Sequence, residues 1–274
     1  MLFNAQTAIS TSAVLLVPYY SWHVPRYHEW MQDEEIQEAT ASEPLTLEGE
    51  YAMQRSWRND ADKLTFIVCL PQQQQQQQPS SEGERHQQLE GEKHHHHQLN
   101  VEDDTLPRML GDINLFLRVE EDSDAEEEDL KAEKARDRLD PGPRIAGEVE
   151  LMIAEKKNQG RGFGRATLLS FLRYVAAHES EIAHEFIGSE DPSVRGFLER
   201  GGRPRLSRLS VKIGCENRRS LALFESALFQ KVSEKPSYFG EFELRRERVV
   251  VAEVEAELRQ AGVLGYVELK YLRE

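Results

Sequence analysis

Three segments of the chain are too polar and repetitive to build a hydrophobic core, and they limit how much of it can fold into one. Residues 71–108 contain seven consecutive glutamines and four consecutive histidines, and residues 120–129 hold eight acidic side chains. Residues 188–208 are rich in glycine, proline and arginine. Such segments bury too little apolar area to offset an ordering cost of roughly 1–2 kcal/mol per residue. We therefore predict insertions at 71–108, 120–144 and 188–208 in a single domain whose remaining residues number about 190.

Composition excludes several classes of protein. The net charge of −15 argues against binding nucleic acid or an anionic membrane through bulk electrostatics. Two cysteines, Cys69 and Cys215, cannot build a disulfide framework and favour a reducing compartment. Residues 13–20 make a poor signal peptide, and no apolar run is long enough to span a bilayer. We expect a soluble monomer in the cytoplasm, with the nucleus as a second location.

Hydrophobic periodicity between the insertions predicts alternating strands and helices. Strands are expected at residues 14–18, 64–70, 112–119, 148–154, 209–213 and 238–250, and helices at residues 23–36, from Thr46 onward, 166–177 and 218–229. Because Pro18 ends the first of these strands, we place that strand at a sheet edge. Residues 251–274 are compatible with a helix followed by a strand. This order predicts a mixed α/β (α+β) fold, with a mixed central sheet flanked by helices.

The most informative chemistry lies in a turn rich in glycine, Asn158-Gln-Gly-Arg-Gly-Phe-Gly164. It follows a predicted strand and opens a predicted helix, where backbone N–H groups can bind an anion and glycine allows a phosphate to approach. Taken alone, the turn is equally consistent with a loop that binds nothing. No Gly-Lys-Ser/Thr follows, which excludes a P-loop, and the glycine spacing does not fit a Rossmann turn.

Two motifs in order resemble a known superfamily. Gln159-x-x-Gly162-x-Gly164 resembles the pyrophosphate loop of the GCN5-related N-acetyltransferases, and Asn217-x-x-Ser220-x-x-x-Phe224 resembles their later Asn-x-x-Ser-x-x-x-Tyr/Phe helix. Residues 24–31, 40–46, 50–54, 57 and 147–155 look like the N-acetyltransferase 9 branch of that superfamily. The resemblance covers about 14–70, 109–118, 146–180 and 209–245, and it skips all three predicted insertions.

The resemblance implies a fold and a cosubstrate. In this superfamily the fourth and fifth strands splay into a V, and the arm of acetyl-CoA enters the gap; no metal is needed. Backbone groups of Met152, Ile153 and Ala154 would pair with the arm, and one N–H would stabilise the developing oxyanion. The resemblance also assigns cofactor contacts to Gln159, Gly160, Arg161, Gly162, Phe163, Gly164, Arg165, Asn217 and Ser220. For Ser220, a place at the N-terminus of its helix explains the residue equally well.

Two carboxylates are the predicted general bases. Glu148 aligns with the catalytic glutamate of the histone-acetylating members, and Glu150 lies two residues on, so both side chains share one face of the strand. Each would raise the pKa of the other in a common pocket. The alternative is two solvent-facing strand residues. The chain departs from the superfamily at Phe224, where many members have a tyrosine that protonates the leaving thiolate, so a dedicated general acid is in doubt.

The acceptor implied by the resemblance is a protein or peptide amine, with the N-terminal α-amine of tubulin chains as the suggested substrate. An α-amine with a pKa near 8 is closer to its reactive neutral form than a lysine near 10.4. Two rival functions remain open: a non-catalytic protein that binds acetyl-CoA or microtubules, and an acetyltransferase for small amines. Trp30, Tyr51 and Trp57 are expected either in the acceptor wall or in the core.

Several reactive-looking residues are given ordinary explanations. The histidines at 94–97 lie in low-complexity sequence without other ligands at metal-binding spacing, so we expect no metal site. Cys215 is expected to be a small buried residue. The arginines of the third insertion are expected in a solvated loop, with contact to an acidic partner as the alternative; they are Arg195, Arg200, Arg203, Arg205 and Arg208.

Overall fold

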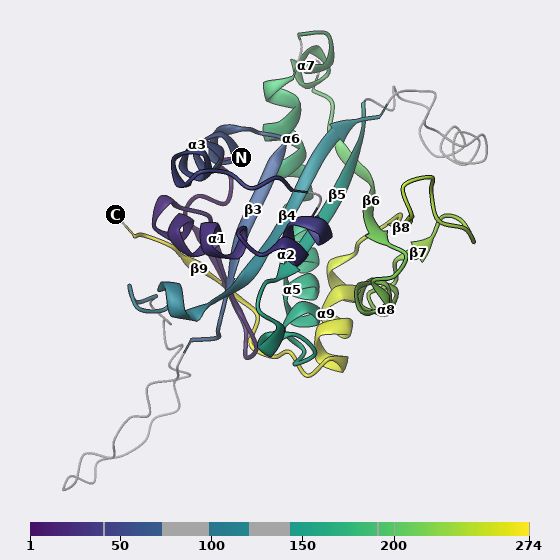
Figure 1. Ribbon diagram of the computed structural model, residues 1–274. Helices are drawn as coiled ribbons and strands as arrows, with labels where there is room; N and C mark the ends of the chain where they lie inside the picture. The colour runs from purple at the N-terminus through teal and green to yellow at the C-terminus, as the bar shows by residue number, and fades with distance from the viewer. Residues whose placement is uncertain (41, 73–98, 121–142, 191, 200, 274) are drawn as a thin grey trace, which may run out of the picture.

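The computed structural model describes residues 1–40, 42–72, 99–120, 143–190, 192–199 and 201–273, and its described strands form one nine-stranded sheet (Figure 1). The strand order is β7-β8-β6-β5-β4-β3-β2-β1-β9. Among the described pairs, β5 and β6 run parallel and all other neighbours run antiparallel. The strands are β1 (Thr7–Ser10), β2 (Leu15–Pro18), β3 (Lys63–Cys69), β4 (Met109–Val119), β5 (Arg144–Ile153), β6 (Arg205–Gly214), β7 (Gln230–Lys231), β8 (Glu241–Arg246) and β9 (Val267–Lys270).

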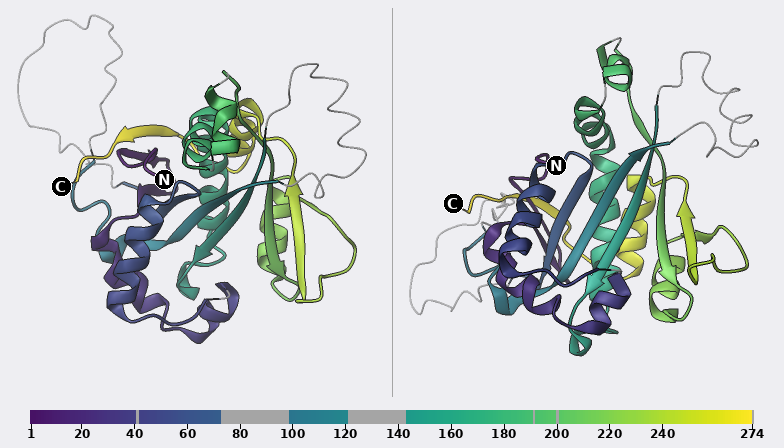
Figure 2. Two further views of the ribbon diagram at one scale, coloured as in Figure 1. Left: turned by 90° about the horizontal axis from the view of Figure 1, so that it is seen from above. Right: turned by 45° about the horizontal axis from the view of Figure 1, so that its top comes forward.

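Helices cover both faces of the sheet, as Figures 1 and 2 show. One face carries α1 (Val24–Trp30), α2 (Glu34–Thr40) and α3 (Leu47–Asn59). The other carries α5 (Phe163–Ala177), α6 (Glu179–Ser189) and α9 (Val251–Gln260), and α7 (Pro192–Glu199) continues from α6. A further helix, α8 (Arg218–Ser226), follows β6. The mixed sheet between helical layers confirms the predicted fold class.

The alternation of side chains along the strands builds two apolar layers. Leu16, Phe66 and Leu115 point toward α5 and belong to the larger layer. Their neighbours Leu15 and Ile67 point the other way and pack in the smaller layer under α1. The strands between these layers are buried on both faces, which explains why residues 64–70 read as a continuous apolar run.

β5 and β6 separate part of the way along their length. Their ladder runs from Arg144 opposite Arg205 to Glu148 opposite Ser210. Beyond that point β5 continues beside β4 to Ile153, and β6 continues beside β8 to Gly214. This is the predicted V-shaped splay; the strands expected as fourth and fifth are β5 and β6, because the chain begins with an additional strand, β1.

Two predictions near the N-terminus were wrong. The strand at 14–18 is not an edge, because β2 lies between β1 and β3 and the described sheet ends at β7 and β9. Pro18 is tolerated there as the last residue of β2. The helix expected at 23–36 is two helices, and Asp33 separates them by accepting the Glu35 amide at 2.9 Å. The helix predicted from Thr46 is confirmed, with the Thr46 hydroxyl capping α3 through the Gly49 amide.

The third predicted insertion, residues 188–208, is largely regular structure. It contains the end of α6, all of α7 and the start of β6. Phe197 is buried, and Gly202 lies so close to its ring that an added Cβ would fall within 2.3 Å of the ring carbon Cζ. Arg208 is also buried, in an ion pair with Glu120. Glycine and proline in this segment make close packing possible and do not indicate a loop.

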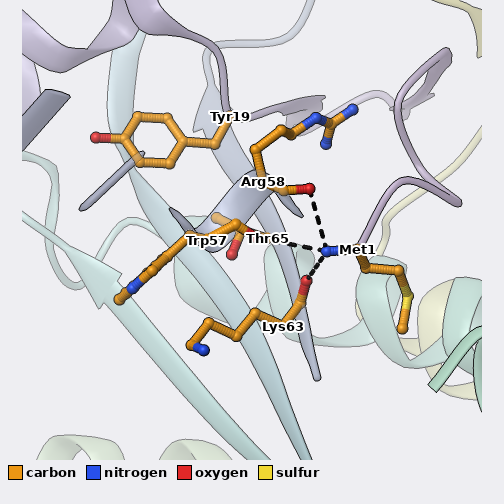
Figure 3. Close-up of a pocket in the computed structure, with 6 residues that line it drawn as sticks. All are labelled: Met1, Tyr19, Trp57, Arg58, Lys63 and Thr65. Atoms are coloured by element: carbon orange, nitrogen blue, oxygen red, sulfur yellow. Dashed lines mark hydrogen bonds between the residues drawn. The ribbon is translucent and has the colours of Figure 1, made fainter. Parts of the chain in front are cut away.

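The C-terminal end of α3 is capped by the chain's own first residue (Figure 3). The α-ammonium of Met1 donates to the carbonyl oxygens of Trp57 at 3.4 Å, Arg58 at 3.3 Å, Lys63 at 2.9 Å and also Asp60. Carbonyl groups at a helix C-terminus lack donors, so the N–H groups of this amine suit the place. Burial lowers the pKa of the amine to about 6, so these N–H groups, rather than a full positive charge, supply the cap near pH 7. A cavity of about 10 Å³, about the space one water needs, adjoins it.

Candidate active site

The turn between β5 and α5 has an open backbone cradle. Gly160 and Gly162 have φ angles of 70° and 89°, in the left-handed region that favours glycine. A Cβ added to either would meet no atom within 4 Å. The six consecutive backbone amides of residues 160–165 have no acceptor within the described chain, and no side chain caps α5. Free amides at the start of a fifteen-residue helix form a site for an anion.

Side chains support this cradle. The Gln159 side-chain amide donates to the Ile153 carbonyl oxygen at 2.9 Å and so ties the turn to the end of β5. Arg165 has a buried Nε without a partner in the part of the chain that the structure describes. Arg161 stacks its guanidinium over the ring of Phe163, 5.4 Å from the centroid. Two arginines beside free amides fit the diphosphate of coenzyme A, so the residues present suit acetyl-CoA.

α8 begins beside the same turn. The Asn217 Oδ1 accepts the Ser220 amide at 3.1 Å, which makes Asn217 the cap and places Ser220 in the first turn. A Cβ on Gly164 would lie 3.3 Å from Leu223 of α8, so glycine there lets α5 and α8 approach closely. Phe224 is buried and packs edge-to-face on Phe229 at 5.2 Å. Phe224 therefore serves the core, and its ring has no hydroxyl that could protonate a leaving thiolate.

The backbone that faces the gap between β5 and β6 differs in part from the expectation. The Ala154 amide donates to the Leu110 carbonyl oxygen at 2.9 Å and is committed to the β4 side. Backbone groups alternate in direction along an antiparallel pair, so those of Met152 also face β4. Those of Ile153 and of Leu151, which the sequence did not single out, face β6. The edge of β5 that faces the gap is thus formed by Leu151 and Ile153, and the Ile153 carbonyl oxygen there already accepts the Gln159 side-chain amide.

Glu148 and Glu150 share one face of β5, as alternation predicts, but their surroundings differ. Glu148 is paired with the Lys212 ammonium at 2.9 Å. Glu150 is exposed at one side, yet enough of it is shielded from water to raise its pKa to about 7. Partial burial is the largest cause, and the negative charges of Asp112 and then Glu148 add to it. Glu150 is therefore an accessible carboxylate whose pKa suits proton transfer near neutrality.

Asp112 is a buried carboxyl group behind Glu150 that the sequence analysis missed. It is 2% exposed, and burial raises its pKa to about 6. It accepts the side-chain amide of Asn114 at 2.7 Å and the hydroxyl of Tyr27 at 3.5 Å. Asn114 stands directly opposite Glu150 in the register of β4 and β5. The sequence does contain a pattern that could have indicated Asp112, because Asp112 and Asn114 are polar residues at alternate positions of an otherwise largely apolar strand.

The three aromatic residues expected at the acceptor wall or in the core belong to packed layers. Trp30 is buried and makes an edge contact with Tyr27. Trp57 packs edge-on against Phe116 of β4, with ring centroids 5.6 Å apart. Tyr51 is half-buried against the smaller apolar layer. Packing therefore accounts for all three, and none is left as an exposed aromatic surface.

The remaining residues singled out from the sequence lie elsewhere. The histidines at 94–97 and Arg200 fall outside the described residues; within the described ones, no three His, Cys, Asp or Glu side chains are grouped to hold a metal. Cys215 is half-buried near the Glu216 carboxylate, 3.8 Å away. Arg195, Arg203 and Arg205 are exposed. Among the described helices, none is long and apolar enough to cross a membrane.

Comparison with known proteins gives close relatives along most of the chain. The chain is 35% identical to an N-acetyltransferase 9-like protein of Schizosaccharomyces pombe, covering 90% of this chain and 99% of that protein. It is 35% identical to the alpha/beta-tubulin-N-acetyltransferase 9 of Drosophila melanogaster, covering 90% and 89%. The protein of the same name from Homo sapiens is 36% identical, covering 89% and 85%.

More distant comparisons add little. No family model matches the chain. Solved structures similar to it include an acetyltransferase of the GNAT family from Bacillus anthracis, with 11% identity, a TM-score of 0.47 and coverage of 88% and 98%. Another is RimL, a ribosomal L7/L12 alpha-N-protein acetyltransferase in complex with coenzyme A, with 12% identity, a TM-score of 0.46 and coverage of 88% and 96%. The assignment rests on the sequence relatives: this chain is an N-acetyltransferase and belongs to the N-acetyltransferase 9 family.

Proposed function

We propose that the protein transfers the acetyl group of acetyl-CoA to the N-terminal α-amine of a protein, by direct attack in a ternary complex. The observation that carries this proposal is Glu150, an accessible carboxylate with a pKa of about 7 two residues past the point where β5 and β6 separate. Acetyl-CoA supplies a reactive thioester as the acyl donor. The amides and arginines of residues 160–165 support binding of its diphosphate. The backbone groups of Leu151 and the Ile153 amide, which face the gap, support binding of its arm.

Glu150 is proposed as the general base, and Glu148 is not. The Glu148 carboxylate is engaged in an ion pair with the Lys212 ammonium, 2.9 Å away. Glu150 has no such partner among the described side chains. It can take a proton from an ammonium with a pKa near 8 at little cost, whereas a lysine near 10.4 would add about 3 kcal/mol. The acid–base match thus favours an α-amine as the acceptor over a lysine side chain.

The proposed acceptor protein is tubulin. The relatives from Drosophila melanogaster and Homo sapiens are named alpha/beta-tubulin-N-acetyltransferases, and this chain shares about a third of its residues with each. A protein substrate also agrees with a base that stays accessible at the surface. The identity of the acceptor is therefore proposed from relatives, and the preference for an α-amine from the pKa of Glu150.

The test is an acetylation assay on a library of peptides with free N-termini, N-terminal tubulin peptides included. We expect transfer to α-amines, release of CoA thiol, and a loss of about 10²–10⁴-fold in kcat/KM for Glu150→Gln. Glu148→Gln is the matched control and should lose much less. Thermal stabilisation by acetyl-CoA without any peptide product would identify a non-catalytic binder. Transfer to small amines in preference to every peptide would identify a small-molecule acetyltransferase.

A further inference from the structure

Four buried oxygen atoms on the Glu150 side of the sheet lack a hydrogen-bond partner. They are Tyr19 Oη, Glu50 Oε2, Thr65 Oγ1 and Asn114 Oδ1, and none has a partner within the described chain. The four residues are 2%, 1%, 7% and 4% exposed. A buried polar atom without a partner costs about 1–3 kcal/mol, and most such atoms in native proteins are paired. Four on one face of a sheet indicate groups that a ligand satisfies.

The four atoms lie on neighbouring elements. Thr65 of β3 is paired in register with Asn114 of β4, and Asn114 is paired with Glu150 of β5. These three side chains form a row across one face, with steps of about 4.8 Å from strand to strand. Tyr19 directly follows β2 and is held by a hydrogen bond from Gln54 of α3 to its carbonyl oxygen, 2.9 Å long. Glu50 lies one helical turn before Gln54.

Charge on this face is mainly negative. Burial raises the pKa of Tyr19, and the negative charges of Glu50 and then Asp112 raise it further. The nearest base to Glu50 is His28, whose Nδ1 lies 3.8 Å from Oε1 and beyond hydrogen-bond distance. Figure 3 shows the Tyr19 hydroxyl pointing away from the Met1 ammonium, which is bound by backbone carbonyls. The carboxyl groups of Glu50, Asp112 and Glu150 therefore give this face a negative charge. Buried nitrogen atoms of α1 and α3 also lack a partner within the described chain; they are Arg26 Nε, His28 Nδ1, Trp30 Nε1 and Arg58 Nη2.

We propose that Tyr19, Glu50, Thr65 and Asn114 form an acceptor subsite that binds the primary ammonium of the acceptor and the N–H groups beside it, next to Glu150. This inference rests on the proposed function and names the residues that select the acceptor. The row of oxygens begins at the exposed Glu150 and runs inward, so a bound ammonium would sit between the base and the buried oxygens. The carboxyl groups of the subsite and of Glu150 favour an acceptor that carries an ammonium group over one without a cation.

The test is a binding cycle that needs no turnover. An N-terminal tubulin peptide and its desamino analogue are titrated by calorimetry into the CoA-bound protein and into the Glu50→Gln variant. We expect the desamino peptide to bind the wild type at least tenfold more weakly than the free-amine peptide does, and the free-amine peptide to bind Glu50→Gln at least tenfold more weakly than the wild type. The desamino peptide should bind Glu50→Gln little more weakly than it binds the wild type, because the two changes remove the same interaction. An undiminished preference of Glu50→Gln for the free amine would overturn the subsite, and so would failure of both peptides to bind.

Tyr19→Phe separates recognition from folding. The hydroxyl has no partner within the described chain, so its removal should leave the melting temperature unchanged or higher while weakening the peptide at least threefold. Tyr271→Phe is the matched control, because the Tyr271 hydroxyl donates to Asp104 and its loss should lower stability but not peptide affinity. Unchanged affinity in Tyr19→Phe would contradict the subsite. A coupled cycle without acetylation would instead refute the proposed function and keep the subsite.

Discussion

Glu150 owes its basicity to its neighbours, and this dependence can be tested by pH. Because partial burial, Asp112 and Glu148 raise its pKa to about 7, kcat/KM should rise with pH through about 7 as the carboxyl group ionises. Asp112→Asn removes a negative charge near Glu150 and should therefore move the rise in kcat/KM to lower pH. The new amide oxygen at position 112 can still accept the hydrogen bond from the Asn114 side-chain amide. The measurement is kcat/KM against pH for both proteins. A limb that stays at the same pH in Asp112→Asn would contradict the coupling.

The same residue should weaken the fold at high pH. A carboxyl group whose pKa is higher in the folded than in the unfolded state binds more protons when folded, so stability falls as pH rises from about 4.5 through about 7. Glu150→Gln removes this loss. We expect its melting temperature to exceed that of the wild type at pH 8 and to match it near pH 4.5, measured by calorimetry in both buffers. A variant less stable than the wild type at pH 8 would show that Glu150 supports the fold.

At this scale the sequence reveals some residues of the site and conceals others. Glu148 and Glu150 are visible because strand alternation places both on one face, but only the structure shows that Lys212 neutralises the first. Asp112 was detectable in principle as a polar residue inside an apolar strand. Tyr19 and Glu50 were not, because Tyr19 lies just beyond the end of β2 and Glu50 reaches that face only through packing of α3 on the sheet. No local pattern encodes such a contact.

Among the elements, the turn before α5 carries the most specific prediction. Gly162 has a φ angle of 89° and is surrounded by open space. In Gly162→Val the branched side chain would enter the cradle and strain the backbone, so acetyl-CoA should bind at least tenfold more weakly. The matched control is Gly188→Ala in α6, where space is also open and the φ angle is not positive. The effect is measured as the calorimetric affinity for acetyl-CoA and as the shift in melting temperature that acetyl-CoA causes. If Gly162→Val bound acetyl-CoA as tightly as the wild type, the turn before α5 would not be the binding site of the diphosphate.

Elements defined by local signals were predictable, and those defined by tertiary packing were not. The helix of α5 follows from its glycine turn and its apolar stripe, and α3 follows from the Thr46 cap. α7 was missed because glycine and arginine dominate the composition around it, although Val194, Phe197 and Leu198 have helical spacing. β1 and β9 are four residues each and pair with one another from opposite ends of the chain, which no local pattern reveals.

At the scale of the whole molecule, the flanks of residues 73–98 are fastened to each other. Asp103 Oδ2 accepts the Gln72 side-chain amide at 3.1 Å and the Asn100 backbone amide at 2.9 Å. The Arg108 guanidinium adds hydrogen bonds to the carbonyl oxygens of Leu70 and Pro71. The two ends of the segment therefore meet within the described fold, and a short connection can replace what lies between them at little entropic cost.

Replacing residues 73–98 with four Gly and Ser residues should therefore leave both the melting temperature and the acetyl transfer rate close to those of the wild type. Removing residues 192–199 in the same way is the matched contrast, because composition marks that segment as an insertion too, yet it carries the buried ring of Phe197. Loss of an aromatic side chain from a packed core costs about 3–5 kcal/mol, so this second variant should melt at a markedly lower temperature. Thermal melts and CoA-release rates of the two variants decide the matter. If the first variant failed to fold, residues 73–98 would belong to the core, and composition would be a poor guide to the boundaries of this domain.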